Sequence, residues 1–151
     1  MSEPVTPEQT RRLAVDLFNE VWRLMERDDR TVADDDRLLH AAHASRHHWG
    51  EIGGPENLAR GEWQISRVYT VLGRAEPALH HARRCLDICV EHGIGDWDLA
   101  YAHEALARAH QAAGDRDLAI ASRRDAERAA QDIADAADRE HLEHDLQTLP
   151  S

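Results

Sequence analysis

Residues 72–88 read LGRAEPALHHARRCLDI, and residues 113–129, which lie 41 positions further along the chain, read AGDRDLAIASRRDAERA. Both stretches contain a glycine, then a small residue followed by an aliphatic one, then a second small residue seven positions on. These residues are Gly73, Ala78, Leu79 and Cys85 in the first stretch and Gly114, Ala119, Ile120 and Ala126 in the second. A fixed period of this length predicts helical hairpins stacked in series, because each hairpin buries its apolar face against its neighbours.

The same 41-residue shift relates further residues on the N-terminal side of these stretches. The pairs are Gly54 and Gly95, Leu58 and Leu99, and Ile65 and Leu106, and a weaker third copy places Leu24, Leu38 and Ala44 one period earlier. The chain is therefore expected to form one domain over residues 1–151. Its expected parts are three repeats at about 18–58, 59–99 and 100–140 and a capping segment at 141–151.

The local sequence favours helices along the chain, since β-branched residues are sparse and no apolar alternation of period two is present. Thr6 followed by Pro7 is typical of a helix start. We expect helices at about 7–28, 34–49, 56–72, 76–92, 96–114 and from 116 into the 130s, and then a polar helix that ends near Leu149. The short joints between them predict antiparallel neighbours, so the expected fold class is all-α.

The composition restricts the kinds of partner that the chain is expected to bind and the cellular compartment in which it is expected to function. The chain carries a formal net charge of −11, which argues against binding to nucleic acid or to a membrane, because anionic phosphates repel it. The sequence contains no stretch of roughly 20 apolar residues and no signal-peptide pattern. Cys85 and Cys89 stand four apart on one expected helix, an awkward geometry for a disulfide. We therefore expect a reduced, cytoplasmic protein.

Residues 72–88 resemble the second half of a tetratricopeptide repeat, and Tyr69 matches the aromatic residue of that repeat's first helix. The next copy departs from the pattern, with His110 in the place of Tyr69 and Arg123 in the place of Ala82. The period exceeds the roughly 34 residues usual for this family, which implies helices about one turn longer. The resemblance implies a TPR-like α-solenoid of about three antiparallel hairpins with a C-terminal capping helix. The alternative is an unrelated helical bundle with alanine-rich faces.

In this family the first helices of successive repeats line a concave, partner-binding groove. The positions that the resemblance assigns to the groove are Asn19, Trp22, Glu26, Arg60, Trp63, Arg67, Thr70, Tyr101, Glu104, Arg108 and Gln111. Trp22 and Trp63 are separated by one period, and so are Arg67 and Arg108. Tryptophan and arginine dominate binding hot spots, so we expect these side chains to contribute most to partner binding.

The expected function is therefore that of a non-enzymatic scaffold or regulator module that binds a protein or peptide. Arg60, Arg67 and Arg108 along one inner surface would favour a partner with an acidic segment. In the alternative, the tryptophans only pack between repeats and the arginines pair with the nearby acids Glu26, Glu62 and Glu104.

The eleven histidines suggest a second reading, a sensor of a small ligand or a metal ion. His40, His43, His47 and Glu51 fall on one face of an expected helix, and helical spacings of three and four suit metal ligands. No zinc-binding motif accompanies them. We therefore expect no metal and no cofactor, and His43 with His47 is the best remaining pair.

No nucleophile elbow, phosphate loop or zincin motif marks a catalytic site, so we expect no enzyme activity and assign no catalytic residue. The only acid–base candidates are His43, Glu62 and His103. The N-terminal helix carries Leu13, Leu17, Phe18 and Val21, more apolar bulk than a terminal cap needs. It is expected to cover the end of the stack or to contact a second copy of the chain in a homodimer.

Overall fold

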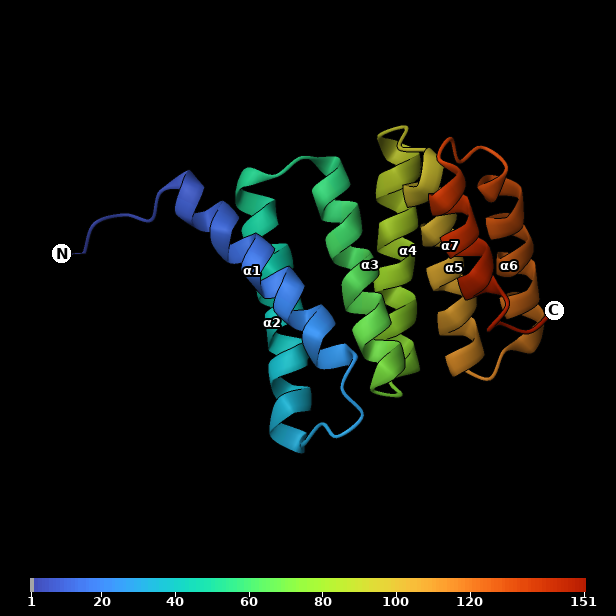
Figure 1. The fold of residues 1–151 in the computed structure, drawn as a ribbon, viewed down its shortest axis with the longest axis horizontal. Coiled ribbons are helices and arrows are strands. Elements are labelled where there is room, and N and C mark those ends of the chain that lie inside the picture. Colours follow the sequence, from blue (N-terminus) through green and yellow to red (C-terminus); the bar gives the residue numbers. More distant parts are fainter. Residues whose placement is uncertain (1) are drawn as a thin grey trace.

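The computed structural model describes residues 2–151, and within that range the chain forms seven α-helices and no strand (Figure 1). The helices are α1 (Pro7–Met25), α2 (Val32–Ile52), α3 (Pro55–Val71), α4 (Ala75–Glu91), α5 (Asp96–Ala112), α6 (Arg116–Ala130) and α7 (Ala136–Leu146). The prediction of an all-α chain is confirmed. No helix in the described range is long and apolar enough to cross a membrane.

The helices pack as successive hairpins along the chain. α1 packs on α2, α3 on α4 and α5 on α6, and the hairpins meet where α2 contacts α3 and α4 contacts α5. α7 returns over the last hairpin and contacts both α5 and α6. In Figure 1, α1 and α7 lie over opposite ends of the molecule, with α3 between them. α1 and α7 therefore lie over one side of the molecule, and parts of α3 and α5 are left uncovered between them.

The 41-residue period is visible in the turns of the second and third hairpins. α4 begins at Ala75 and α6 at Arg116, one period later. Gly73 and Gly114 precede them with φ of 74° and 80°, a left-handed conformation that costs glycine little because it has no Cβ. The amide after each glycine closes the same turn, from Arg74 N to Tyr69 O at 2.8 Å and from Asp115 N to His110 O at 2.9 Å.

The N-terminal hairpin departs from the period. α1 begins at Pro7, where the capping box of Thr6 and Gln9 starts the helix, and α2 extends beyond the expected range of 34–49 at both ends. Ala44 is only partly buried, whereas its neighbour Ser45 is buried, and the hydroxyl of Ser45 donates to Ala14 O at 2.7 Å. A buried hydroxyl requires such an acceptor, so Ser45 ties α2 to α1.

The C-terminal helix is more than a polar cap. α7 begins at Ala136, before the segment 141–151 in which the sequence placed the cap, and it buries Leu142 and Leu146 completely. They join Ile133 and Leu149 in a core cluster with alanines of α5 and α6. Because many residues of this segment are acidic, its overall composition does not reveal this narrow apolar stripe.

Alanine fills much of the core between neighbouring helices. Ala78 and Ala82 of α4 and Ala105 and Ala109 of α5 form one cluster and are at most 5% exposed. Small side chains allow helix axes to approach closely, and they leave no internal space for the large aromatic residues. The tryptophans and tyrosines are accordingly only partly buried.

Candidate binding site

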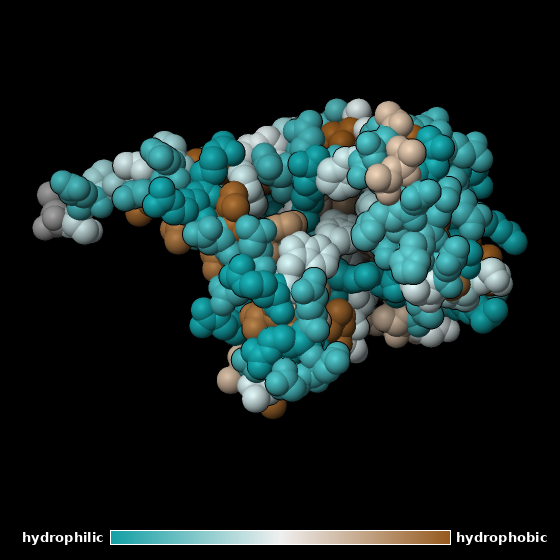
Figure 2. Space-filling view, in the orientation of Figure 1, coloured by the Kyte–Doolittle hydropathy of each residue, from teal (hydrophilic) through white to brown (hydrophobic). Residues whose placement is uncertain are grey.

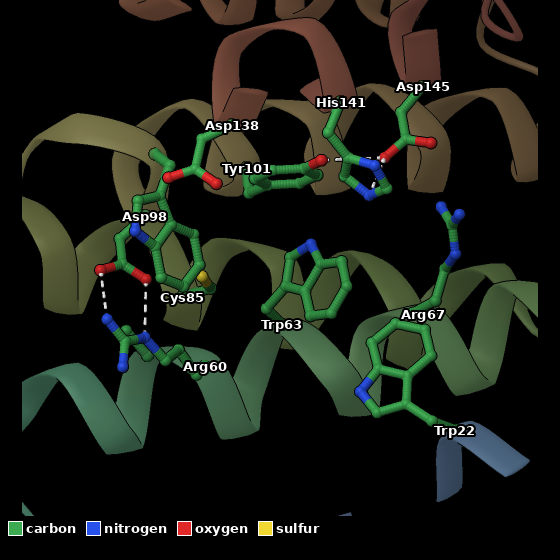
Figure 3. Close-up of a pocket in the computed structure, with 12 residues that line it drawn as sticks. Trp22, Arg60, Trp63, Arg67, Cys85, Asp98, Tyr101, Asp138, His141 and Asp145 are labelled. Carbon is green, nitrogen blue, oxygen red and sulfur yellow. Dashed lines mark hydrogen bonds and ion pairs between the residues drawn. The ribbon is translucent and has the colours of Figure 1, made fainter. Parts of the chain in front are cut away.

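A cavity of about 450 Å³ lies between α1, α3, α5 and α7. Figure 3 shows its lining, which consists of Trp22, Ala59, Arg60, Trp63, Arg67, Cys85, Trp97, Asp98, Tyr101, Asp138, His141 and Asp145. In the space-filling view, the surface between the N-terminal hairpin and the C-terminal helices is hollowed and carries side chains of intermediate hydropathy among hydrophilic ones (Figure 2). The cavity thus combines a large aromatic surface with charged groups.

Four aromatic side chains form the walls. The rings of Trp22 and Trp63, which stand 41 residues apart in the sequence, lie 5.4 Å apart between centroids. The ring of Tyr101 lies edge-on to Trp63 at 5.7 Å and to Trp97 at 6.4 Å. Trp97 and Tyr101 share a face of α5 because they stand four residues apart. These edge-to-face and tilted contacts keep the walls in place.

Arg60 occupies one end of the cavity and is held on two sides. Its guanidinium donates to both carboxylate oxygens of Asp98, at 3.0 and 3.1 Å, and lies 4.5 Å from the ring centroid of Trp97. A bidentate carboxylate and an aromatic face together are the preferred surroundings of a guanidinium. The charge of Arg60 is therefore balanced within the fold.

Arg67 and Arg108 share one carboxylate beneath the other end. Glu104 is 1% exposed, and its Oε1 accepts from Arg108 Nε at 2.6 Å and from Arg67 at 3.5 Å. Arg108 also donates to Asp145 O at 3.2 Å and to Thr148 Oγ1 at 2.9 Å, which connects α5 to the end of α7. Glu104 is thus a structural anchor that faces the arginines rather than the solvent.

α7 supplies the acidic side of the cavity. The hydroxyl of Tyr101 donates to Asp145 Oδ2 at 3.0 Å, and burial together with the negative charge of Asp145 raises the pKa of Tyr101. His141 Nε2 lies 3.7 Å from the same oxygen. Asp138 is exposed and lines the cavity. Within residues 2–151 its carboxylate makes no hydrogen bond or ion pair, so it is available to a ligand.

The loop before α7 is fixed to the start of α5, which sets where these acids lie. Asp96 adopts a φ of 54°, unusual for a residue with a side chain. Its carboxylate accepts from Trp97 N at 2.7 Å and from Ala134 N at 3.2 Å. Such local bonding is how aspartate tolerates the left-handed region.

The structure distributes the predicted groove residues over several environments. Trp22, Arg60, Trp63, Arg67 and Tyr101 line the aromatic cavity. Thr70, Arg108 and Gln111 line a second, more open cavity of about 380 Å³ between α3 and α5, which Arg67 also borders. Glu104 is buried, whereas Asn19 on α1 and Glu26 directly after α1 are exposed and line neither cavity.

Sequence reasoning missed Trp97, Asp98 and the three residues of α7. The four-residue spacing of Trp97 and Tyr101 on one helix was a signal that could have found Trp97. The residues of α7 gave no such signal, because the repeat pattern does not extend to this helix and its return over α5 is a tertiary feature.

A second polar cluster lies on an adjacent face of α3, among α2, α3 and α4. Glu62 is 7% exposed, and its Oε2 lies 2.6 Å from His81 Nδ1 while its Oε1 accepts from Arg46 at 3.2 Å. Burial alone would raise the pKa of Glu62, but the hydrogen bond and charge of His81 and the charge of Arg46 outweigh it and lower the pKa. His43 Nε2 lies 2.9 Å from the hydroxyl of Tyr69. We call these five residues the histidine network.

The three acid–base candidates do not form one site. His43 and Glu62 belong to the histidine network, where His81 occupies the place opposite Glu62. His103 lies on the α6 side of α5, where burial lowers its pKa and Asp125 and Arg128 exert smaller, opposing effects. The imidazole of His103 is thus in a separate environment from the carboxylate of Glu62.

The candidate metal pair is also divided. His43 contacts Tyr69 and His81 in the interior, whereas His47 is exposed beside Glu51, with 3.7 Å between Nε2 and Oε1. In the part of the chain that the structure describes, no group of three or more histidine, cysteine, aspartate or glutamate residues is placed to hold a metal ion. Cys85 and Cys89 are buried free thiols, and the neighbouring Cys89 thiol and burial raise the pKa of Cys85.

Comparison with known proteins adds no relative from which a role could be transferred: no protein-family model, curated protein or solved structure matches the chain.

Proposed function

We propose that the chain is a non-enzymatic scaffold or regulator module that binds a peptide segment of a partner protein. The observation that carries this proposal is the aromatic cavity, whose volume of about 450 Å³ falls within the roughly 300–1,000 Å³ typical of ligand sites. The peptide would run from this cavity to the second one, since Arg67 borders both.

The proposed arrangement of the helices is a TPR-like stack of about three hairpins, with its binding side formed by α1, α3 and α5. Three features support it: the equivalent turns at Gly73 and Gly114, the alanine contacts between hairpins, and the meeting of Trp22 with Trp63. In such a stack, each first helix contributes residues to one continuous face.

The chemistry of the cavity suits a peptide. Large, rigid aromatic side chains lose little conformational entropy on binding and bury much apolar area, which is why they dominate hot spots. The arginines and aspartates around them supply directional polar contacts. Trp22 in particular contacts only Phe18 and Trp63 among aromatic rings and belongs to no core cluster, so part of its surface is available to a partner.

The proposal is tested by panning a displayed library of random peptides against the purified chain. We expect enriched peptides with a shared motif whose affinity falls about tenfold or more in Trp22→Leu, the loss typical of a hot-spot residue. Trp49→Leu is the matched control, because Trp49 stacks with Arg11 at the end of α2, away from the cavity. Circular dichroism would verify that both variants fold. Absence of a shared motif, or equal affinity for Trp22→Leu and wild type, would contradict the proposal.

A small-ligand sensor is the second candidate, favoured by the volume of the cavity and by its lining, which comes from five helices. The ligand would then occupy the aromatic cavity, because the histidine network satisfies its own hydrogen bonds. Native mass spectrometry of the chain purified from its host tests this candidate. A bound small molecule that is lost in Trp22→Leu and kept in Trp49→Leu would support it, and a ligand-free chain would count against it.

A further inference from the structure

We infer that the aromatic cavity receives a basic side chain of the bound peptide, an arginine in preference to a lysine. The inference rests on the proposed peptide-binding function and specifies the chemistry of its anchor residue. Three independent features of the cavity support it: an internal guanidinium that is already bound there, unpartnered carboxylate oxygens, and the local balance of charge.

The first feature is the site of Arg60. Its guanidinium lies between the indole face of Trp97 and the carboxylate of Asp98, with contacts at 4.5, 3.0 and 3.1 Å. This end of the cavity shows which combination of groups the fold uses to hold a guanidinium, namely an aromatic face on one side and a carboxylate on the other.

The second feature is that α7 presents unpaired carboxylate oxygens to the cavity, across from the rings of Trp22 and Trp63. In Figure 3, Asp138 lies toward Asp98, whereas Asp145 lies beside His141 at the end where the guanidinium of Arg67 also lies. Asp138 makes no hydrogen bond or ion pair within residues 2–151. The bonds to Asp145 reach Oδ2, which leaves Oδ1 free to accept from a ligand.

The third feature is the charge balance. Arg60, Arg67 and Arg108 are the cations in and beneath the cavity, and Asp98, Glu104, Asp138 and Asp145 are the corresponding anions. The anions exceed the cations by one, and the whole chain carries −11, so the field favours a cationic ligand. An acidic segment, by contrast, would have to compete with Asp98 and Glu104 for arginines that these carboxylates already bind.

The test uses four peptides of sequence acetyl-Gly-Ser-X-Ser-Gly-amide, in which X is arginine, lysine, citrulline or glutamate. Citrulline has the shape of arginine without its charge. Binding is followed by NMR through the four indole N–H signals, of which Trp49 lies outside the cavity and serves as an internal control. We expect the arginine peptide to shift the signals of Trp22 and Trp63 and to leave Trp49 unchanged. Citrulline should bind about tenfold more weakly, since it lacks both the cation–π contact and the charge-assisted hydrogen bonds.

A pair of variants separates the cavity from the general charge of the chain. Asp138→Asn should weaken the arginine peptide about threefold or more, whereas Glu140→Gln should not, because Glu140 carries the same charge on the same helix but does not line the cavity. Equal binding of arginine and citrulline, stronger binding of glutamate, or equal effects of the two variants would overturn the inference.

The two proposals fail in distinguishable ways. If peptides selected from the library depend on Trp22 but contain no basic residue, the inference is wrong and the peptide-binding function stands. If no selected peptide depends on Trp22, the peptide-binding function is wrong, and the inference fails with it.

Discussion

Two clusters of similar composition lie on adjacent faces of α3, and they differ in whether their groups are already satisfied. The aromatic cavity and the histidine network each contain aromatic rings, arginine, histidine and carboxylates. Consecutive residues of α3 contribute to the two clusters. Glu62 belongs to the network and Trp63 to the cavity, and the two side chains point about 100° apart around the helix. In the network both carboxylate oxygens of Glu62 have a partner, Tyr69 stacks on His81, and His43 contacts both rings edge-on. The cavity retains volume and free acceptors. Unoccupied volume and unpaired hydrogen-bond acceptors, rather than residue type, therefore distinguish the candidate binding site from the structural cluster.

The largest effect is expected from a substitution at the centre of the histidine network. Glu62→Gln would leave Arg46 and His81 without their anionic partner and should lower the free energy of unfolding by about 2–3 kcal/mol, somewhat less than for a fully buried pair because Arg46 is partly exposed. Urea denaturation measures the loss. Glu56→Gln on the same helix is the exposed control and should change stability little. A stable Glu62→Gln protein would show that the network contributes little to the fold.

A smaller effect is expected where α2 and α3 cross. A Cβ at Gly61 would lie 2.7 Å from Cδ of Arg46 and 3.5 Å from its Cα, so Gly61→Ala should cost about 1 kcal/mol net, overpacking exceeding the gain in helix propensity. The equivalent residue one period later is a buried alanine, Ala102. Gly50→Ala is the control, because its Cβ would meet only the mobile end of Arg46. If thermal denaturation finds Gly61→Ala more stable than wild type, the close crossing is not a constraint.

Three histidines, one in the histidine network and two on α5, should also make stability depend on pH. Burial is the largest cause that lowers the pKa of His43, His103 and His110 below the ordinary value of 6.5. The unfolded chain therefore binds protons more readily, so stability is fully present above about pH 6.5 and is lost as the pH falls below it. Urea midpoints at pH 7.5 and 5.5 measure this change. His43→Gln should reduce the difference, and the exposed His47→Gln should not; an equal midpoint at both pH values would refute the expectation.

The smallest expected effect lies on the cavity side. Asp138→Asn should alter the free energy of unfolding by no more than about 0.5 kcal/mol, because its exposed carboxylate has no partner within residues 2–151. Asp98→Asn, which breaks the bidentate pair with Arg60, should cost more. Melting temperatures of the two variants give the comparison. A loss for Asp138→Asn as large as that for Asp98→Asn would mean that the cavity acids are structural and would remove the contrast between the two clusters.

Sequence reasoning predicted the aromatic residues of the cavity better than the environment of its charged residues. The 41-residue shift placed Trp22 and Trp63 on equivalent positions, and their rings lie 5.4 Å apart. It also placed Arg67 and Arg108 together and left open whether they form a free positive surface or pair with nearby acids; in the structure both bind Glu104. Periodicity reports which helix face a residue occupies, whereas pairing depends on side chains that meet across helices far apart in sequence.

The all-helical character of the chain and the turns at Gly73 and Gly114 could be predicted from the sequence, because they follow from local propensity, glycine conformation and apolar spacing. The return of α7 over α5, which completes the cavity with Asp138, His141 and Asp145, could not be predicted in this way. The return depends on burying Leu142 and Leu146 against a distant core and on the bond from Ala134 N to Asp96, and no short-range pattern in the chain encodes either contact.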